Sequence, residues 1–431
     1  MKLSKTSRLA LVSRLIPVPQ LVLVSRLFLV SFTGLAAAAL LTGCQLVTVD
    51  YVYVASSSGS SAGSAGQIQT YAVDSESGAL RSAGTPTVPS GGTDPVAMAV
   101  TANYYHLYVA NQGNSSVVHF SISDVGVLTQ KDSITTAQPP VYLAVNQANT
   151  YLYVISGTTS ATLTEYALNT DGVIGSAVAQ ETLTLPSPYS TDTMVPTGVA
   201  TLPTSSSSLT VTADAVYVTA YDQSAYNPGG ITTSTANPGW VFGFAVDSSG
   251  ALTPTTDSPY QAGVKPTAII AEPASRFIYV TDFASNELIG YTIENDDVLS
   301  FMVDGPFKTG NEPESIVVDP RGSYIYLVNQ LDNTVSGYTI NLPTGSPSAL
   351  VSSNSSLYAT DTEPVSLTLE PALGRFVYTA NHLGNSISGF RLNPNTGAMT
   401  ATVSGPYPTG ADPTAIVSVP HGNHSTESIT P

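Results

Sequence analysis

Acidic side chains gather beside a proline that recurs along the chain. They are Asp94, Glu312, Glu314, Glu363 and Asp412, with Lys265 as the one basic residue at such a position. Converging carboxylates can bind a cationic ligand or a hard cation such as Ca²⁺. The alternative is a solvated acidic rim, since the chain has 30 acidic and 13 basic residues and acids are mostly exposed. These six residues are our candidates for ligand binding. Ca²⁺ is the one candidate cofactor, and the sequence indicates no particular metal ligands.

Histidines and serines could supply acid–base or nucleophilic chemistry, but their surroundings in the sequence are poor. His382 follows Asn381 at an expected hairpin, where a base could face a ligand. His106 and His119 lie beside expected strands, and an isolated histidine is more often structural than catalytic. The segment 59–63 fits Gly-x-Ser-x-Gly, but no helix follows it, as a nucleophile elbow would require. His382 is therefore the only histidine kept as a catalytic candidate.

The first 43 residues predict an export signal. They contain five basic residues and no acid, and an apolar run from Leu27 to Leu41 precedes Cys44. The sequence Leu-Thr-Gly-Cys that ends at Cys44 resembles the bacterial lipobox, in which the cysteine is lipidated. A membrane-spanning anchor is the alternative, although the run is short against the ~20 residues that a spanning helix needs. We expect a signal peptide at 1–43, a lipidated linker at 44–49 and a location in the bacterial cell envelope, on the outer membrane or facing the periplasm or the exterior.

Charge and cysteine content exclude several classes of function. Without the signal the chain carries eight basic and 30 acidic residues, a net charge of −22. A general nucleic-acid binder needs the opposite balance, because it must neutralise phosphates. Cys44 is the only cysteine, which excludes an intrachain disulfide and a cysteine-based zinc site. The expected partners are the membrane, through Cys44, and an unidentified small molecule or protein, and we expect a monomer.

The rest of the chain repeats one unit seven times, which predicts the fold. Each unit has a tyrosine between apolar residues, a later aromatic residue and, in most units, a preceding proline. The seven tyrosines are Tyr53, Tyr108, Tyr153, Tyr217, Tyr279, Tyr326 and Tyr378. A period of about 53 residues with turn residues between short apolar runs is typical of a β-propeller blade.

One unit shows how the strands follow from the residues. Pro313 starts a buried strand at its first residue, a position where proline is tolerated. The segment 319–322, Asp-Pro-Arg-Gly, forms a turn, and the strand around Tyr326 follows. A hairpin at 329–333 leads to a third strand at 335–340, and a fourth strand completes the blade. We expect Asn111, Asn329 and Asn381 to occupy left-handed turn positions, because asparagine tolerates them.

The ends of the repeat predict how the ring closes. The first unit begins at Tyr51 without an inner strand, whereas 413–419 supplies an inner strand without a tyrosine strand after it. The last strand should therefore complete the first blade. The prediction is an all-β, seven-bladed propeller at 50–420 with four antiparallel strands per blade, followed by a flexible tail at 421–431.

Two segments interrupt the period. The segment 55–66 contains mostly serine, glycine and alanine and resembles a flexible loop. The segment 221–240 holds three aromatic residues, including the only tryptophan, Trp240. Because aromatic residues are enriched at interfaces, this second insertion is a candidate contact for a ligand or partner.

The Pro-led repeat with Tyr-Val-x-Asn resembles the lactonase-type seven-bladed propellers, the 6-phosphogluconolactonase relatives, and YVTN-repeat surface proteins. In those lactonases, an Arg-His pair after the proline and a glutamate after the tyrosine strand are taken to form the active site. The matching positions here are Glu314, Ser315 and Gln330. The resemblance thus implies the fold, while the residues that carry the activity differ.

Three functions stay open from the sequence. The first is a lipid-anchored binding or interaction module with the catalytic set replaced. The second is a hydrolase of uncharged lactones, with a site rebuilt from His382, Glu314, Gln330 and nearby hydroxyls, because opening a lactone needs a base and an oxyanion donor. The third is a structural envelope protein.

Overall fold

The computed structural model describes residues 47–57, 65–158, 160–185, 193–203, 214–223, 226–227, 230–231, 239–350 and 357–422. Residues from Thr48 onward form one compact unit, and this unit holds every described strand. Cys44 and the expected signal lie outside the described residues. Within the described part, no helix is long and apolar enough to cross a membrane.

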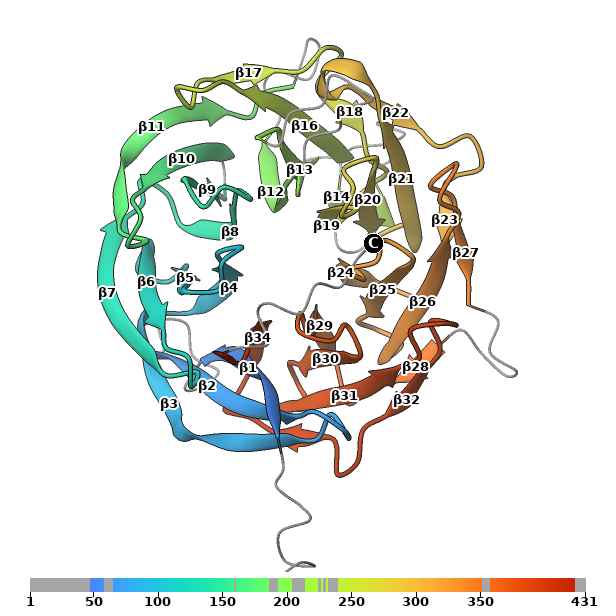
Figure 1. Cartoon of the computed structure of the whole chain (residues 1–431). Helices are drawn as coiled ribbons and strands as arrows, with labels where there is room; N and C mark the ends of the chain where they lie inside the picture. The colour runs from blue at the N-terminus through green and yellow to red at the C-terminus, as the bar shows by residue number, and fades with distance from the viewer. Residues whose placement is uncertain are drawn as a thin grey trace, which may run out of the picture. The chain divides into compact units, whose positions relative to one another are not determined.

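Seven antiparallel sheets stand around a central axis, as Figure 1 shows. The inner strands are β34 (Pro413–Pro420), β4 (Pro95–Val100), β8 (Pro140–Val145), β12 (Met194–Thr201), β19 (Pro266–Ala271), β24 (Pro313–Val318) and β29 (Pro364–Leu369). The second strands, which carry the tyrosines, are β1 (Thr48–Ser57), β5 (His106–Asn111), β9 (Tyr151–Ser156), β13 (Val216–Asp222), β20 (Phe277–Asp282), β25 (Tyr324–Asn329) and β30 (Phe376–Asn381). The third strands are β2 (Ala65–Asp74), β6 (Ser116–Ile122), β10 (Thr162–Leu168), β16 (Gly239–Val246), β21 (Glu287–Ile293), β26 (Thr334–Ile340) and β31 (Ser386–Leu392).

The outer strands differ between two parts of the ring. Blades 1–3 each have one continuous outer strand: β3 (Leu80–Thr93), β7 (Leu128–Thr135) and β11 (Ile174–Thr182). In blades 4–7 this strand is split into two pieces that both pair with the third strand: β17 (Leu252–Pro254) with β18 (Tyr260–Gln261), β22 (Leu299–Phe301) with β23 (Phe307–Lys308), β27 (Pro347–Ala349) with β28 (Leu357–Ala359), and β32 (Met399–Ala401) with β33 (Tyr407–Pro408). The predicted four-layer blade is confirmed, with this added detail.

The ring closes as the repeat ends predict. β34 pairs with β1 from Asp50 opposite Pro420 to Ser56 opposite Pro413, so blade 1 takes its inner strand from the C-terminal part of the chain. β1 begins at Thr48, slightly before the expected start. The His421 amide also bonds to the Val49 carbonyl, so the ordered chain continues past 420. Residues 423–431 of the expected tail lie outside the described residues.

The hydrophobic core consists of seven clusters, one between each pair of neighbouring blades. The repeated tyrosine of every second strand is fully buried in these clusters. In six blades its hydroxyl donates a hydrogen bond to a turn carbonyl of the next blade: Tyr53 to Gly126, Tyr108 to Gly172, Tyr217 to Asp297, Tyr279 to Gly345, Tyr326 to Gly397 and Tyr378 to Gly78. Burial of each blade face against its neighbour explains why the repeat forms a ring.

The expectation about the hairpin asparagines is wrong. Asn329 and Asn381 do not occupy left-handed turn positions. They end their strands fully buried, and each side-chain amide donates to two hydroxyls of the next strand. Asn111 is likewise a buried strand end, bonded to Ser90. The left-handed residues of these hairpins are Ser115, Asn333 and Asn385, four residues later.

The second insertion is shorter than expected. Tyr221 belongs to β13 and Trp240 to β16, where Trp240 packs against the core between blades 3 and 4. Between them the structure describes only a small hairpin of β14 (Tyr226–Asn227) and β15 (Gly230–Ile231). The loop in 55–66 narrows to 58–64, which lies outside the described residues. A single short 3-10 turn, η1 (Asn295–Asp297), is the one helical element of the described part.

Candidate functional site

The inner strands share a bulge that points one side chain per blade into the central channel. In each blade the strand register shifts just after the proline. Such a bulge leaves one residue unpaired and re-aims its side chain. The seven bulge residues are Val96, Val141, Thr197, Thr267, Glu314, Val365 and Thr414, and all seven line a channel cavity of about 380 Å³.

Glu314 is the only charged residue among the described residues that line this cavity. The other polar lining groups are hydroxyls, from Tyr142, Thr197, Thr267, Ser315, Ser366, Thr368 and Thr414. Glu314 is half-buried, because the narrow channel surrounds its carboxylate while leaving it open to the cavity. Burial raises the pKa of Glu314 to about 7, Lys265 opposes this, and Glu312 and Glu363 add to it. The channel thus holds one carboxyl group that can exchange a proton near neutral pH.

Lys265 is the basic neighbour of Glu314. Burial lowers the pKa of Lys265, while Glu314 and Glu312 oppose that shift. Its ammonium lies 3.8 Å from the centre of the Phe283 ring, a cation–π contact. Its position is fixed by the backbone, since the Asp282 carboxylate accepts hydrogen bonds from the Val264 and Lys265 amides. Lys265, Glu312 and Glu314 therefore form one electrostatic group at the mouth of blades 5 and 6.

In every blade except blade 4, the residue before the inner-strand proline sits at an equivalent place on the mouth of the channel. Its carbonyl accepts the amide that follows the tyrosine strand, as from Gln330 to Glu312 at 2.8 Å and from His382 to Glu363 at 2.7 Å. Asp412, Asp94, Lys265, Glu312 and Glu363 all hold this position in their blades. The four acids have left-handed backbones, with φ between 51° and 58°. Non-glycine residues adopt that region at a cost of about 1 kcal/mol or more.

The structure brings part of the candidate set together. Gln330 donates from its side-chain amide to Glu363 at 3.1 Å, which links blades 6 and 7. Glu363 also acts on the pKa of Glu314. Asp94 and Asp412 continue the acidic arc into blades 2 and 1, on the other side of the channel from Lys265. Among the described residues, no group of three His, Cys, Asp or Glu side chains is arranged to hold a metal ion.

His382 is not joined to the other catalytic candidates. Its Nδ1 lies 3.2 Å from the Pro413 carbonyl, which can only accept, so the proton belongs on Nδ1 and Nε2 is left as the basic nitrogen. No hydrogen bond within the described part connects His382 to Glu314 or Gln330. The three residues lie on the same face but do not form a relay.

The bulge hydroxyls of Thr197, Thr267 and Thr414 were missed from the sequence. Thr267 and Thr414 donate to the proline carbonyl of the next blade, at 2.7 Å and 2.6 Å, and so bridge neighbouring inner strands. The available signal was their shared position directly after the recurring proline. They set the polarity of the channel wall.

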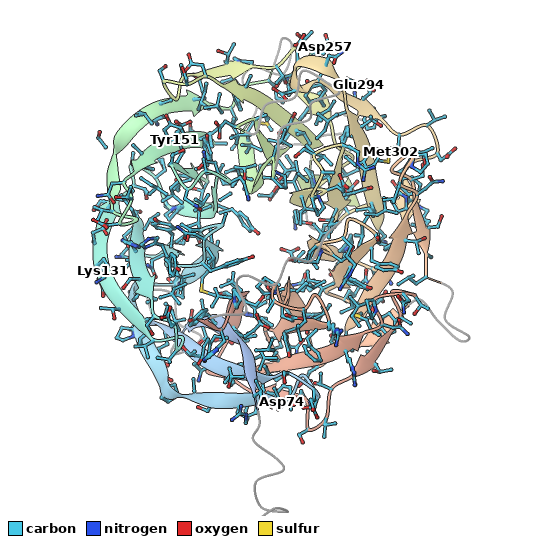
Figure 2. The ribbon with its side chains drawn as sticks, viewed as in Figure 1. Asp74, Lys131, Tyr151, Asp257, Glu294 and Met302 are labelled. Carbon is cyan, nitrogen blue, oxygen red and sulfur yellow. The ribbon has the colours of Figure 1, made fainter. Side chains whose placement is uncertain are left out.

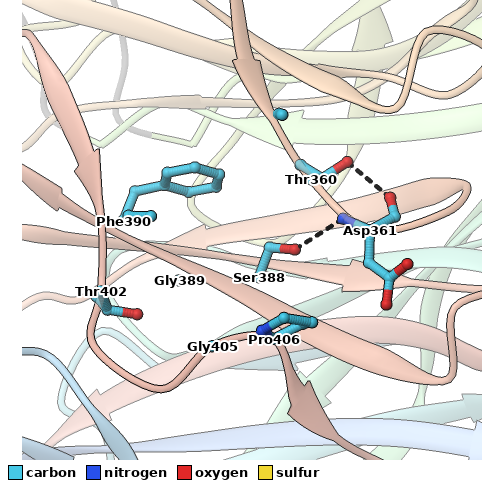
Figure 3. A pocket seen from close by; sticks show the side chains of 10 residues that line it. Thr360, Asp361, Ser388, Gly389, Phe390, Thr402, Gly405 and Pro406 are labelled. Atoms are coloured by element: carbon cyan, nitrogen blue, oxygen red, sulfur yellow. Dashed lines mark hydrogen bonds between the residues drawn. The ribbon is translucent and has the colours of Figure 1, made fainter.

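A second hollow lies on blade 7, away from the channel (Figure 3). It is lined by Thr360, Asp361, Ser388, Phe390 and Thr402, with a volume of about 330 Å³. Its polar groups already bond to one another: Ser388 accepts the Asp361 amide at 3.0 Å, and Thr360 donates to the Asp361 carbonyl at 2.8 Å. This hollow therefore offers a ligand few unused partners.

The chain matches the family model described as "Lactonase, 7-bladed beta-propeller" over residues 51–239, 244–361 and 269–423. No curated protein sequence matches it. Among solved structures, a periplasmic gluconolactonase from Pseudomonas aeruginosa is 17% identical, covering 86% of this chain and 99% of that one, with a TM-score of 0.66. A Bacteroides uniformis protein, provisionally described as a 6-phosphogluconolactonase, is 16% identical over 86% and 100%, with a TM-score of 0.64. A protein from Lactobacillus plantarum is 14% identical, covering 86% of this chain and 100% of that one, with a TM-score of 0.65. At these identities the structures share the fold.

Proposed function

Because the chain belongs to the lactonase family of seven-bladed β-propellers, we propose that it is a variant of that fold used for binding. In this proposal a lipid on Cys44 holds the propeller in the bacterial cell envelope, and the channel mouth takes a neutral or cationic small molecule. The observation that carries it is Glu314, a carboxylate at the only charged bulge position of the channel.

The charge of the channel argues against a phosphorylated substrate. A phosphate group is held by arginine or lysine, and no basic residue is among those described as lining the cavity. Lys265 lies beside the cavity, but Glu314 and Glu312 already act on its ammonium. A phosphosugar lactone would therefore meet a carboxylate, whereas an amine or a hydroxyl-rich ligand would meet an acceptor and a ring of hydroxyls.

The left-handed acids support a role for the mouth. Asp94, Glu312, Glu363 and Asp412 keep a strained backbone that glycine would adopt freely. Ordinary hairpins of this protein have the same conformation, as at Ser115, Asn333 and Asn385, so the charge of the mouth acids supports the proposal and their backbone conformation does not. We infer that these acids are kept for the charge that they place around the mouth.

One observation favours a second function, hydrolysis of uncharged lactones. A pKa of about 7 would let Glu314 remove a proton from water at neutral pH. The oxyanion would then have to be stabilised by other lining hydroxyls, such as those of Tyr142 and Ser315, because Thr267 and Thr414 already donate to proline carbonyls and the candidate set contributes no arginine. His382 would act separately from Glu314 in such a mechanism.

A ligand panel separates the two functions. We expect glucosamine and neutral sugars, but not 6-phosphogluconate, to raise the melting temperature of the protein. Glu314→Gln should abolish the glucosamine effect, whereas Glu294→Gln, at an exposed acid away from the channel, should preserve it. Melting temperatures that none of these compounds changes would contradict binding at this mouth.

The hydrolase is tested with the same protein and gluconolactone. Acid release measured by a pH indicator should not exceed the uncatalysed rate if the propeller only binds. Turnover that Glu314→Gln abolishes and Glu294→Gln preserves would establish the second function instead. Mass spectrometry of the membrane-associated protein tests the lipid on Cys44.

A further inference from the structure

A hollow on blade 7 collects two arginines and no acid. It has a volume of about 480 Å³ and is lined by Arg375, Arg391, Leu392, Asn393, Pro394, Ala398 and Thr400. We call it the arginine hollow. It lies at the ends of β30 and β31 that are opposite to the channel mouth, since Arg375 directly precedes β30 and Arg391 pairs with Phe376. Such a concentration of positive charge is unusual in a chain with so few basic residues.

Neither arginine is neutralised within the described part of the chain. Arg375 and Arg391 are both exposed, and neither forms an ion pair or a side-chain hydrogen bond. Blade 5 provides the internal comparison, because Arg276 holds the position that Arg375 holds in blade 7. Arg276 forms an ion pair with Glu272 and donates to the Leu342 carbonyl.

The difference between these blades has a physical cause. Glu370 is the counterpart of Glu272, and both carboxylates accept amides of the turn that follows, from Leu373 and Arg375 in blade 7 and from Ala274 and Arg276 in blade 5. Glu370 differs in that it also lies against the buried Asp50. Burial raises the pKa of Glu370, which weakens it as a partner for a cation. The Arg375 guanidinium is therefore left for the hollow. Two arginines beside each other repel unless an anion lies between them.

We propose that the arginine hollow binds an oxyanion of the phosphate type. Two guanidinium groups offer the paired donors that phosphate oxygens favour. Asn393 and Thr400 add donors, since Asn393 uses its side-chain oxygen for the Asn395 amide and keeps its NH₂ group. This site differs from the channel in position and in the charge of its ligand.

The phosphate of a membrane lipid is the source that the position favours. Another hollow, of about 590 Å³, shares both arginines with the arginine hollow and reaches Ser75, Glu76 and Ser77 of blade 1. These residues follow Asp74, which pairs with Thr48 at the start of β1 (Figure 2 labels Asp74). Cys44 is four residues before Thr48, a span of at most ~14 Å. This choice of source rests on the proposed lipid anchor, whereas phosphate binding itself does not.

The site is tested by calorimetry and melting with inorganic phosphate at constant ionic strength. We expect saturable binding that Arg375→Gln and Arg391→Gln each weaken about tenfold or more, because each removes charged hydrogen bonds. Arg276→Gln is the matched control, on the same side of the ring and already paired, and should bind phosphate normally. Arg375 and Arg391 are exposed, so their variants should melt nearly as the unmodified protein does without phosphate, whereas Arg276→Gln removes the ion pair to the buried Glu272 and should melt at a lower temperature. Absent binding, or equal loss in Arg276→Gln, would overturn the proposal.

Vesicles distinguish the lipid from free phosphate. The chain from residue 45, without any lipid of its own, keeps the whole compact unit. It should bind phosphatidylglycerol vesicles more than phosphatidylcholine vesicles at low salt, and the Arg391→Gln variant should lose the difference. Phosphate binding without a vesicle preference would overturn the lipid source and leave a soluble phosphorylated ligand. If mass spectrometry finds no lipid on Cys44 while the phosphate and vesicle experiments both give the expected results, only the proposed lipid anchor is wrong.

Discussion

Blades 1–3 and blades 4–7 differ in the residue that packs beside the buried tyrosine. The residue opposite the buried tyrosine is glycine in blades 4–7: Gly243, Gly290, Gly337 and Gly389. In blades 1–3 it is Thr70, His119 and Glu165. The change coincides with the outer strand, which is continuous in blades 1–3 and split in blades 4–7.

The split strand explains the glycine. Where the outer strand is interrupted, one residue turns inward, and its amide bonds to the glycine carbonyl, as Leu350 does to Gly337 at 2.9 Å. A Cβ on Gly337 would lie 2.7 Å from Leu350 Cδ1. Blade 3 instead has Ala179 opposite Glu165, which leaves room for a long side chain. The outermost strand thus decides what can lie beside the tyrosine.

The long side chains of blades 2 and 3 have different surroundings. His119 is fully buried and bonds to Asp132 at 2.5 Å and to His106 at 3.0 Å. Asp132 also accepts the Ile174 amide of blade 3. Glu165 is equally buried, yet neither of its carboxylate oxygens has a hydrogen-bond partner in the described part. The comparison teaches that one position can hold a satisfied polar network or an unsatisfied one.

Glu165 also interrupts the ring of tyrosine bonds. Tyr153 is the only one of the seven buried tyrosines whose hydroxyl lacks a hydrogen bond among the described residues. The carbonyl that the pattern assigns to it belongs to Gly250, and a Cβ on Gly250 would collide with Glu165 Oε1. Tyr151, labelled in Figure 2, borders the same space. The interface between blades 3 and 4 is thus the irregular one.

The largest effect should come from placing a glutamate opposite the buried tyrosine of a blade with a split outer strand, such as blade 6. Gly337→Glu would force a side chain into Leu350 and bury an unpaired carboxylate, at a cost of at least ~4 kcal/mol. We expect the variant to be largely unfolded or insoluble, as measured by circular dichroism and solubility. A folded Gly337→Glu protein would show that the split strand does not control this position.

The next effect concerns pH. Burial, with Asp214 and Asp247 adding to it, raises the pKa of Glu165 to about 7, while Tyr153 opposes the shift. A raised native pKa means that stability is full below about pH 4.5, falls as pH rises towards 7 and is level above it. Glu165→Gln should remove about 3 kcal/mol of this fall.

Denaturant unfolding at pH 4 and pH 8 measures this loss of stability with rising pH. The two proteins should differ in their change of unfolding free energy between the two pH values, with the variant the less sensitive. Glu181→Gln, on the neighbouring outer strand, is the control and should follow the unmodified protein. Parallel pH profiles for all three proteins would contradict the assignment.

The smallest effect compares two tyrosines. Tyr326→Phe leaves the buried Gly397 carbonyl without its donor and should lower the unfolding free energy by about 1–2 kcal/mol. Tyr153→Phe removes a hydroxyl that bonds to no turn carbonyl and acts instead on the buried Glu165, so it should lower the unfolding free energy by less than Tyr326→Phe does. Chemical denaturation of both variants at pH 6 tests the difference, and equal losses would show that Tyr153 bonds in solution.

The sequence predicts the ring well because its signals are local and repeated. A proline, a tyrosine and an aromatic residue recur in nearly every blade, so the strands and the closing strand follow from spacing alone. The position of Glu314 could also be predicted, since it directly follows Pro313. Its isolation in the channel depends on all seven bulges together, which no single repeat shows.

Other features depend on pairings that spacing does not reveal. Glu165 and His119 lie in unremarkable strand positions, and only the register shows that each faces a buried tyrosine. Asn329 was misassigned because asparagine suits both a left-handed turn and a buried strand end that bonds to hydroxyls. Trp240 was assigned to a loop because proline and glycine precede it, whereas packing on the blade 3–4 core places it in a strand.

The closing pair of strands also fixes how the propeller would respond to force. β1 and β34 run antiparallel with Asp50 opposite Pro420, so the two described ends of the chain leave the ring side by side. Tension between those ends would break the hydrogen bonds between β1 and β34 one after another, which takes less force than breaking them together. If the proposed lipid anchor and the proposed mouth ligand are both present, tension between them would pull along β1 instead and load its bonds to both neighbouring strands together.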